Sequence, residues 1–307
     1  MQTDVIILGA GTAGLSAAIY ATRAGLSVTV LEHAIQGGQI INAPEVDNYP
    51  GLANISGVEF VQNIYQQAVD FGASVVYESI KAFDFSRALK QVDTDKNRYE
   101  AKAVIIANGA RHRHLDVPGE VEFAGKGVSY CATCDGAFYR GKDVCIVGGG
   151  NTALEDALFL SNNCNKVYLI HRRDEFRAHA TTVEAVSKRD NIEILTPYTV
   201  SRIEGEASVN RVVLSGAVDG AEKTIEVAGV FIAVGLSPDN GMFSPALELD
   251  RDGYFVAGED CRTNIEGVYA AGDTRRKEVR QLVTAAADGA VAAIGAANYI
   301  NQNRSKW

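Results

Sequence analysis

The sequence has no excess of positive charge, no long apolar run and few cysteines, and each absence narrows the class of protein. Its 29 basic and 38 acidic residues give a formal net charge of -9, so we expect no nucleic-acid-binding surface. No apolar run approaches the ~20 residues needed to span a bilayer, and no basic segment of the signal-peptide kind precedes the first strand-like run. Five cysteines, an odd number without a disulfide framework, suit a reducing cytosol. We therefore expect a cytoplasmic protein that binds neither nucleic acid nor membrane.

Proline is also scarce, with six prolines against 30 glycines. This ratio favours many tight turns between strands and helices over a disordered chain. Hydrophobic residues make up 47% of the chain and charged residues 22%, as is normal for a folded globular protein. The length of 307 residues allows two domains, each with its own core.

Two cysteines stand three positions apart, in the segment Cys131-Ala132-Thr133-Cys134-Asp135-Gly136. Cys145, Cys164 and Cys261 are isolated, so no second close pair completes a four-ligand zinc site, and we expect no metal. The pair is either packed in the core or an accessible redox dithiol, and its polar, turn-prone neighbours favour the dithiol. In a reducing compartment such a dithiol would cycle catalytically rather than act as a fixed crosslink.

The amino-terminal segment has the pattern of strand, glycine-rich turn and helix. A strand from Asp4 to Leu8 enters the G-A-G-T-A-G turn of residues 9–14, and a helical stretch follows. The next strand, Val28 to Leu31, ends at Glu32, which lies 21 residues past Gly11. The glycines let the backbone approach a pyrophosphate at a helix N-terminus, and an acid at this distance can bond a ribose hydroxyl. The segment therefore predicts a dinucleotide site.

A second copy of this unit follows, with basic residues where the first has its acid. A strand from Asp143 to Val147 enters the G-G-G-N-T-A turn of residues 148–153, and the next strand, Lys166 to Ile170, ends in His171-Arg172-Arg173, with Arg177 beyond. Basic groups there suit a 2′-phosphate and favour NADPH over NADH. The alternative is a solvated, charge-rich loop. Two such units imply two nucleotides, and the first, with its acid, would take FAD.

The remaining elements are expected to complete two sheets. Three apolar runs that enter glycine, residues 103–110, 229–235 and 267–273, have the character of strands buried on both faces of a doubly wound sheet. A helix is expected over about Gly57 to Phe71, and an alanine-rich helix over about Val283 to Tyr299.

Short and irregular segments separate these elements. Residues 74–77, 80–85 and 98–102 have the pattern of short antiparallel strands. The segments His112–Pro118 and Leu236–Asn240 carry proline and little periodicity, so we interpret them as the crossings between two domains.

Taken together, these motifs form a specific combination. They are GAGTAG, GGQ, VDNYPG (residues 46–51), CATCDG, GGGNTA, HRR with Arg177, AAGD, and the pair Arg280-Gln281. From Gly9 to about Tyr299 the chain resembles the low-molecular-weight, bacterial-type thioredoxin reductases of the FAD/NAD(P)-dependent pyridine nucleotide-disulfide oxidoreductase family. One departure is Asn108, where many relatives have threonine; Asn tolerates left-handed geometry, so the fold is not in doubt.

The resemblance implies an α/β fold with two Rossmann-like nucleotide-binding domains of the three-layer ββα type, the second inserted into the first. Residues 1–113 would form the first part of the FAD-binding domain and residues 241–307 its second part. Residues 114–240 would form the NADPH-binding domain that carries the dithiol. The family also implies a homodimer.

The resemblance, with the two nucleotide patterns, assigns the site residues. Asp273 would bond the ribityl chain of FAD, and Gln281 would reach the flavin ring. The residues expected to bind FAD are Gly9, Gly11, Gly14, Glu32, Gly38, Gln39, Asn48, Gly109, Gly272, Asp273, Arg280 and Gln281. Those expected to bind NADPH are Gly148, Gly150, Asn151, Thr152, His171, Arg172, Arg173 and Arg177.

The implied activity is that of an NADPH-dependent thioredoxin-disulfide reductase, with electrons passing from NADPH to FAD, to the Cys131–Cys134 disulfide and to thioredoxin. In the family the second cysteine faces the flavin, so Cys131 would attack the partner. Asp135 would serve as acid/base, unless it only caps a helix starting near Gly136. Because dithiol and NADPH turn share one domain, we expect that domain to rotate between half-reactions.

Three other interpretations stay open. The same relay could run backward in an FAD-dependent dithiol oxidase, or serve another small dithiol protein. A flavin-binding redox sensor without turnover is the alternative from another class, although it would not need the dithiol, the acid and both turns together. Phe138, Tyr139 and Arg140 follow the dithiol and would either receive thioredoxin or pack in the core.

Overall fold

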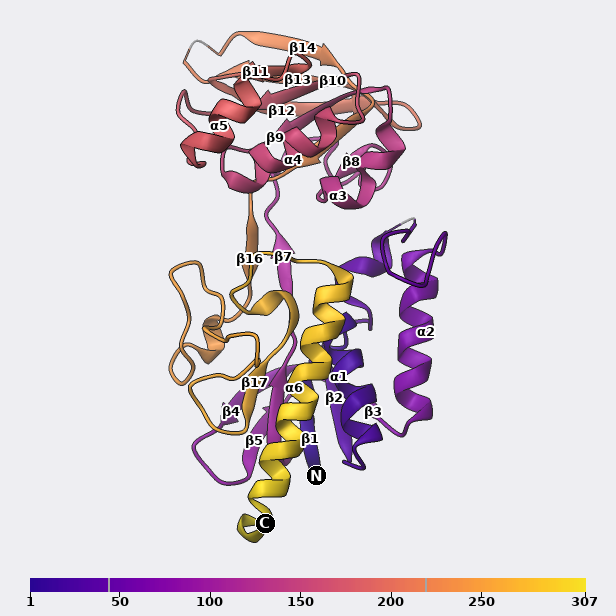
Figure 1. The fold of residues 1–307 in the computed structure, drawn as a ribbon, viewed down its shortest axis with the longest axis vertical. Helices are drawn as coiled ribbons and strands as arrows, with labels where there is room; N and C mark the ends of the chain where they lie inside the picture. Colours follow the sequence, from indigo (N-terminus) through magenta and orange to yellow (C-terminus); the bar gives the residue numbers. More distant parts are fainter. Residues whose placement is uncertain (44, 219) are drawn as a thin grey trace. The chain divides into compact units, whose positions relative to one another are not determined.

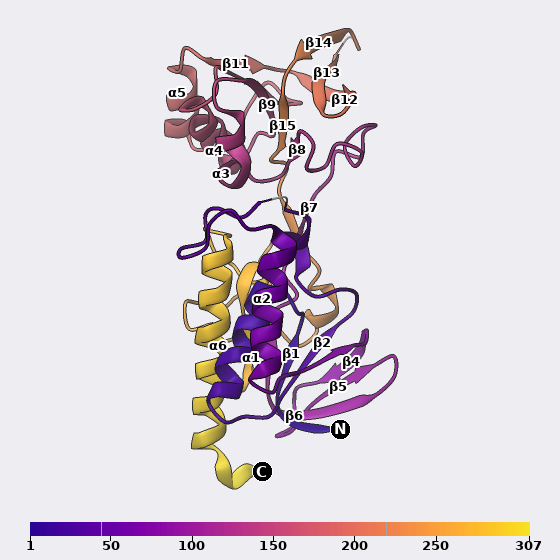
Figure 2. The same cartoon turned by 90° about the vertical axis from the view of Figure 1, so that its right-hand side faces the viewer.

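Buried apolar strands form two parallel sheets, one in each of two units into which the chain divides (Figures 1 and 2). The computed structural model describes residues 1–43, 45–218 and 220–307. Unit 1 comprises Met1–Arg111 and Ser237–Trp307, and unit 2 comprises His112–Leu236. Strands β7 (Ala110–His112) and β16 (Leu236–Pro238) pair as a two-stranded sheet where the chain passes from one unit to the other and back.

The sheet of unit 1 has the strand order β3-β2-β1-β6-β5-β4, and β17 pairs with β6. Strand β6 pairs in parallel with β1 along most of its length, in antiparallel with β5 at its start and in parallel with β17 at its end. The expected separate strand over residues 98–102 is therefore wrong, because those residues begin one nine-residue strand. The strands are β1 (Gln2–Leu8), β2 (Val28–Glu32), β3 (Ser74–Tyr77), β4 (Ile80–Asp84), β5 (Lys90–Thr94), β6 (Arg98–Ile106) and β17 (Val268–Ala270).

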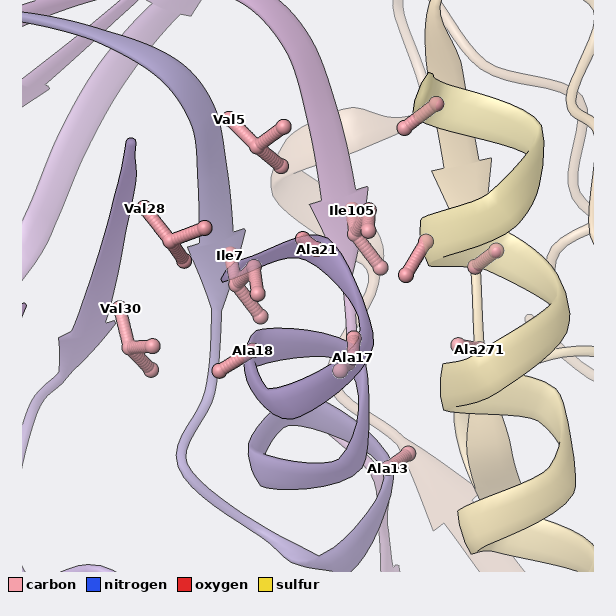
Figure 3. Close-up of a cluster of buried hydrophobic side chains, with 14 of the residues drawn as sticks. Val5, Ile7, Ala13, Ala17, Ala18, Ala21, Val28, Val30, Ile105 and Ala271 are labelled. Carbon is pink, nitrogen blue, oxygen red and sulfur yellow. The ribbon is translucent and has the colours of Figure 1, made fainter. Parts of the chain in front are cut away.

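Alternation along β1 divides the core of unit 1 into two layers. Val5 and Ile7 join the apolar cluster that contains the alanines of helices α1 and α6, as the close-up in Figure 3 shows. Ile6 and Leu8 point to the opposite side and join a second cluster with Phe255. The helices are α1 (Thr12–Arg23), α2 (Gly57–Asp70) and α6 (Leu282–Gln302), with 3-10 turns η1 (Gly38–Asn42), η3 (Gly241–Phe243), η4 (Gly272–Thr274) and η5 (Arg304–Lys306).

Helix α6 is, among the described residues, the one helix long and apolar enough by length and composition to cross a membrane. Its small residues instead pack against α1. A Cβ on Gly289 would lie 2.1 Å from the carbonyl oxygen of Ala13, so the two helices are in backbone contact there. Ala292, Ala293 and Ala296 are at most 1% exposed. We therefore interpret α6 as a core helix of unit 1.

Unit 2 consists of a parallel sheet with helices on one face and an antiparallel sheet on the other. Its parallel sheet has the order β11-β10-β9-β15-β8, and a three-stranded antiparallel sheet, β12-β13-β14, covers one face. Val144 and Ile146 of β9 pack with the helices, whereas Cys145 and Val147 pack with the antiparallel sheet. The elements are α3 (Ala132–Asp135), η2 (Gly136–Tyr139), α4 (Asn151–Ser161), α5 (Ala180–Ser187), β8 (Val128–Ser129), β9 (Asp143–Val147), β10 (Lys166–Ile170), β11 (Ile192–Leu195), β12 (Tyr198–Gly205), β13 (Val209–Gly216), β14 (Glu222–Glu226) and β15 (Gly229–Ile232).

These layers confirm the predicted fold class. Each unit has a parallel nucleotide-binding-type sheet with helices on one face and an antiparallel β layer on the other. A glycine-rich turn leads from β1 into α1 in unit 1 and from β9 into α4 in unit 2, and each turn lies at the carboxyl end of its strand, where such sheets bind their ligands.

Candidate active site

The redox centre of unit 2 is a disulfide between Cys131 and Cys134, with an S–S distance of 2.07 Å and Cα atoms 5.3 Å apart. Cys131 is the N-cap of the one-turn helix α3, and Cys134 lies within it. Both cysteines are half-buried, and the Cys131 Sγ lies 3.4 Å from the hydroxyl oxygen of Thr133. The pair is therefore neither packed in the core nor committed to a metal.

Asp135 is fixed by the strand that precedes the dithiol. The Ser129 hydroxyl donates to Asp135 Oδ2 at 2.6 Å, and the Cys131 N–H donates to the Ser129 oxygen at 3.1 Å. Ser129 thus closes the dithiol loop from both ends. The alternative that Asp135 only caps the helix starting near Gly136 is wrong, because its side chain makes no capping hydrogen bond to η2.

The two aromatic residues after the dithiol have different surroundings. Tyr139 packs edge-on against the Phe231 ring, with centroids 5.3 Å apart, and belongs to the helix-side core of unit 2. The side chain of Phe138 is 41% exposed, and Arg140 is exposed as well. Core packing therefore accounts for Tyr139, while Phe138 and Arg140 remain candidates for a partner contact.

The other three cysteines are free and buried, unlike the pair in the disulfide. They are Cys145, Cys164 and Cys261, and burial raises the pKa of each thiol, that of Cys261 to about 12. Thiols with raised pKa are poor nucleophiles. Among the described residues, no group of three or more His, Cys, Asp or Glu side chains has a metal-binding arrangement.

A buried hydrogen-bond cluster precedes the dithiol and was missed in the sequence. Glu120 is 1% exposed, and its carboxylate accepts from the Tyr130 hydroxyl at 2.8 Å and from the N–H groups of Leu115 and Asp116. The Tyr130 oxygen also lies 2.9 Å from His114 Nδ1. Burial would raise the pKa of Glu120, but these hydrogen bonds hold it below its ordinary value. The cluster fixes the residue next to Cys131.

The glycine turn of unit 1 is built as the sequence predicts. Gly11 is the N-cap of α1, with extended backbone and no side-chain cap, so the first N–H groups of the helix are not used by a capping side chain. Glu32 is 7% exposed, and its carboxylate accepts from the backbone N–H of Ala10 at 2.9 Å and from His33 and Ala34. Oε1, which accepts from His33 and Ala34 and lies 3.0 Å from His33 Nδ1, is taken up by its own loop, whereas Oε2 accepts from Ala10. A carboxylate oxygen has about two acceptor positions, so Glu32 stabilises the turn, and its Oε2 retains a position for a ligand hydroxyl.

The carboxyl-terminal part of unit 1 contributes two buried polar atoms without a partner among the described residues, Asp273 Oδ1 and Arg280 Nε. Burial raises the pKa of Asp273, against the attraction of nearby cations. The Arg280 guanidinium lies over the Tyr254 ring, 4.3 Å from its centroid. The amide of Asn48 donates to Gln281 Oε1 at 3.3 Å, so two residues 233 positions apart in sequence meet here.

Further predicted residues of unit 1 line its backbone turns. The Gln39 side-chain amide donates to the carbonyl oxygen of Ala110. Gly38 and Gly109 adopt positive φ angles of 65° and 69°, conformations that favour glycine. Asn108 does not adopt the left-handed geometry that its type tolerates; instead its amide donates to Asn240 Oδ1 at 3.0 Å.

The glycine turn of unit 2 has a histidine and three arginines around it. Gly150 is the N-cap of α4 without a side-chain cap. His171 is 6% exposed, its Nε2 has no partner among the described residues, and a Cβ on Gly149 would lie 2.2 Å from its ring. The backbone N–H of Arg177 donates to the Gly149 carbonyl oxygen at 2.7 Å, and the Asn151 side chain accepts from the His179 N–H at 2.8 Å.

The arginine side chains lie on the surface of this turn. Arg172, Arg173 and Arg177 are exposed, as is Thr152. The salt bridges among the described residues of unit 2 involve other side chains. In the part of the chain that the structure describes, none of the three arginines forms a salt bridge with a carboxylate, which suits the binding of an anion near a helix N-terminus. Burial, with the nearby arginines, lowers the pKa of His171, which favours its neutral form.

Comparison with known proteins agrees with this geometry. The family model described as pyridine nucleotide-disulphide oxidoreductase matches residues 3–289. The thioredoxin reductase of Treponema pallidum (strain Nichols) is 44% identical over 304 residues, covering 98% of this chain and 99% of that protein. The thioredoxin reductase of Bacillus subtilis (strain 168) is 40% identical over 300 residues, covering 97% and 95%. The crystal structure of thioredoxin reductase from Streptococcus pyogenes MGAS5005 is 38% identical, with a TM-score of 0.93 over 98% of this chain and 99% of that one. The chain therefore belongs to the low-molecular-weight thioredoxin reductases of the pyridine nucleotide-disulphide oxidoreductase family.

Proposed function

We propose that this chain is an NADPH-dependent thioredoxin-disulfide reductase that uses FAD. The observation that carries the proposal is the Cys131–Cys134 disulfide, which stands in the same unit as a nucleotide turn. NADPH gives up its electrons as a hydride, whereas a disulfide is reduced to two thiols, so the proposal includes an electron carrier between the two. When bound, FAD supplies that chemistry by passing electrons from NADPH to the disulfide.

The residues of unit 1 fit FAD. The buried, unpartnered Asp273 Oδ1 is an acceptor that suits a ligand hydroxyl, and the Arg280 Nε is a donor that suits a ligand oxygen. The first turn of α1 offers backbone N–H groups to a pyrophosphate, and Glu32 offers acceptor positions to a ribose. We assign unit 1 as the FAD-binding domain, with Gly9, Gly11, Gly14, Glu32, Gly38, Gln39, Asn48, Gly109, Gly272, Asp273, Arg280 and Gln281 as its site.

The residues of unit 2 fit NADPH. The N-terminus of α4 would hold the pyrophosphate, and the exposed arginines Arg172, Arg173 and Arg177 would bind the 2′-phosphate. His171 packs on Gly149 and supports the turn from within. We assign Gly148, Gly150, Asn151, Thr152, His171, Arg172, Arg173 and Arg177 to this site, and unit 2 as the NADPH-binding domain.

The dithiol then reacts in two steps, its own reduction and the reduction of thioredoxin. Uptake of two electrons and two protons breaks the Cys131–Cys134 bond and leaves two thiols. The Cys131 thiolate attacks one sulfur of the thioredoxin disulfide and releases the other as a thiolate; Cys134 then attacks Cys131, which restores the disulfide and releases reduced thioredoxin. Asp135, held next to the loop by Ser129, would accept and return the protons of these thiols.

The chain order also supports a motion of unit 2. NADPH site and dithiol belong to one unit, and both must reach the same flavin, while Cys131 must also reach an outside protein. We propose that unit 2 rotates about the two connecting segments, on the μs–ms scale usual for hinge motions. A covalent crosslink between the units should stop turnover; full turnover after crosslinking would contradict the motion. By family resemblance we also propose a homodimer in the cytoplasm.

The test is anaerobic mixing of the purified protein with NADPH or NADH, followed by thioredoxin and a chromogenic disulfide. We expect NADPH to bleach the flavin absorbance and thioredoxin to be reduced. Absence of bleaching by NADPH would refute the donor assignment. Bleaching without thioredoxin reduction would point to a dithiol oxidase or to another dithiol partner, and binding without turnover would point to a sensor.

The cysteine roles need a variant pair. Cys134→Ser should abolish thioredoxin reduction, because the disulfide can no longer form. Cys164→Ser is the matched control, since Cys164 is a free, buried cysteine of the same unit, and it should retain turnover. A Cys134→Ser protein that still reduced thioredoxin would overturn the relay.

A further inference from the structure

One buried carboxylate beside the flavin site has no task in the function proposed above. Asp288 lies in α6 and is 5% exposed. Its Oδ2 accepts from the Gly272 N–H at 2.9 Å, from Arg275 Nε at 2.8 Å and from Lys277 Nζ at 2.9 Å, and its Oδ1 accepts from Arg275 Nη2 at 2.8 Å. All these donors come from one segment, Gly272–Lys277, which contains Asp273.

The four donors reach both oxygens of this carboxylate, three of them Oδ2 and one Oδ1. All four belong to the chain itself, so we infer that Asp288 acts on the cofactor through the segment that it holds. The side chains of Arg275 and Lys277 are only 3% and 6% exposed, so solvent screens these ion pairs little.

The same carboxylate ties three elements together where the flavin would bind. Gly272 has a φ of 80°, and a Cβ on it would lie 2.8 Å from the Cβ of Ala13, in the first turn of α1. On α6, the neighbouring Gly289 packs against the backbone of the same turn, and Ser16 donates to the Ala286 carbonyl oxygen at 2.7 Å. A shift of Asp288 would therefore move the segment relative to the helix N-terminus that receives the pyrophosphate.

Asp273 differs from Asp288 in having a buried oxygen without a partner among the described residues. Lys277 donates to Asp288 and stands four positions after Asp273 in the same segment, and its charge opposes the burial that raises the pKa of Asp273. While Lys277 donates to Asp288, it does not occupy Asp273. Without the Asp288 charge, this buried ammonium would lose its hydrogen-bonded carboxylate, and the open, buried Asp273 oxygen of the same segment would be available to it, because a buried cation strongly favours a paired position.

We propose that Asp288 is a positioning residue for the flavin site: it holds the segment Gly272–Lys277 and keeps Lys277 off Asp273, so that Asp273 stays open to a hydroxyl of the bound flavin. The inference rests on the proposed function, because FAD is the ligand. It places the control of flavin binding in a residue that does not touch the flavin.

The experiment measures FAD affinity of the full-length, flavin-stripped protein by quenching of flavin fluorescence, with circular dichroism as a check of folding. Asp288→Asn should bind FAD about ten- to a hundredfold more weakly than the wild type, the range expected when a buried donor loses its partner. Lys277→Met in the Asp288→Asn background should recover part of the loss, because it removes the cation that would turn to Asp273. A merely structural role for Asp288 predicts no such recovery.

Asp4→Asn is the matched control. Asp4 also accepts three hydrogen bonds, from Ser27 N–H at 2.8 Å, Ser27 Oγ at 2.9 Å and Lys102 Nζ at 2.7 Å, but it lies at the amino end of β1, away from the glycine turn. This variant should lose stability and keep its FAD affinity.

The outcomes separate the inference from the proposed function. A folded Asp288→Asn protein with the affinity of the wild type would overturn the inference. If Asp288→Asn alone does not fold, the comparison passes to Lys277→Met with and without Asp288→Asn: weaker FAD binding by the double variant supports the inference, and equal binding overturns it. Failure of the wild type itself to bind FAD would refute the proposed function instead.

Discussion

The two glycine turns share one backbone arrangement and differ in the side chain that completes it. In unit 1 the N–H of Gly9 donates to the carbonyl oxygen of Leu31, near the end of β2, at 2.8 Å. In unit 2 the N–H of Gly148 donates in the same way to the carbonyl oxygen of Ile170, at the end of β10, at 3.0 Å. In each unit the loop after that strand returns, and a backbone N–H donates to the carbonyl of the turn's second residue, at 2.8 Å from Gly37 and 2.7 Å from Arg177. The backbone arrangement is therefore common to both turns, and under the proposed function it would hold a pyrophosphate in each.

The difference lies 21 residues beyond each helix N-cap. There unit 1 has Glu32, whose carboxylate accepts from Ala10, and unit 2 has His171, whose ring packs over Gly149. The equivalent of the acid is thus the histidine, and Arg172 stands one position later. The comparison teaches that the two turns do not differ in their backbone; under the proposed function, the residues at the end of the second strand would decide which ribose group is recognised.

The largest expected effect tests the shared backbone. A Cβ on Gly14 would lie 1.9 Å from the Gly9 carbonyl oxygen, whereas the equivalent residue of unit 2, Ala153, already carries a buried methyl. Gly14→Ala should therefore destabilise unit 1 by about 3 kcal/mol or more, the upper range for overpacking, and abolish FAD binding. The measurement is the unfolding free energy together with the FAD content of the purified protein.

Gly241→Ala is the control for this prediction. A Cβ there would meet no atom within 4 Å, and Gly241 is in the same unit. It should leave both stability and FAD content near the wild-type values. A Gly14→Ala protein as stable as Gly241→Ala would show that the turn relaxes easily, and the comparison of the two turns would lose its steric basis.

Much of this backbone could be predicted because glycine and apolar runs mark it locally. The strands Asp143–Val147 and Lys166–Ile170 lie where the sequence predicted them. The strand over residues 74–77 also lies in its predicted place, but its predicted antiparallel pairing is wrong, because it pairs in parallel with β2. Strand β6 was misjudged because its character changes along its length: the start alternates between exposed and buried positions, and the end is buried on both faces. Two patterns suggested two strands, and only the pairing with β1, far away in sequence, joins them.

Parts of the candidate site were hidden for a different reason. Glu120 and Asp288 look like ordinary surface acids in the sequence, because burial of a carboxylate depends on donors brought from elsewhere. The donors of Asp288 lie 11 to 16 positions away in sequence and those of Glu120 include Tyr130. The alternative of Asp135 as a cap came from its position alone, whereas the hydroxyl that binds it belongs to the preceding strand. Tertiary hydrogen bonds of this kind have no local sequence signal.

The second prediction sharpens the difference in charge. Arg172→Ala combined with Arg173→Ala should raise the KM for NADPH about tenfold or more, since a charge-assisted pair to phosphate contributes roughly 1.5–3 kcal/mol. The KM for NADH should change little, because NADH has no 2′-phosphate. Steady-state kinetics with both nucleotides measure the ratio, and Arg189→Ala, an exposed arginine of the same unit, is the control. An equal loss for both nucleotides would reject a phosphate clamp.

The smallest expected effect is a loss of folding stability at low pH, which we expect from His171 and not from its counterpart Glu32. Burial, with the charges of Arg177, Arg172 and Arg173, lowers the pKa of His171. An unfolded histidine has a pKa near 6.5, so as the pH falls below about 6.5 the unfolded state binds a proton that the folded state does not. The stability contributed by neutral His171 is therefore present above that pH and is lost progressively toward the lowered pKa of the folded state.

Thermal unfolding between pH 8 and 5.5 should show this loss in the wild type and a shallower slope of stability against pH in His171→Gln. His179 is an exposed histidine of the same unit, and His179→Gln should keep the wild-type slope. High salt should alter the slope only slightly, because salt screens the arginines but not the burial; equal slopes in all three proteins would mean that the ring on Gly149 does not sense acid.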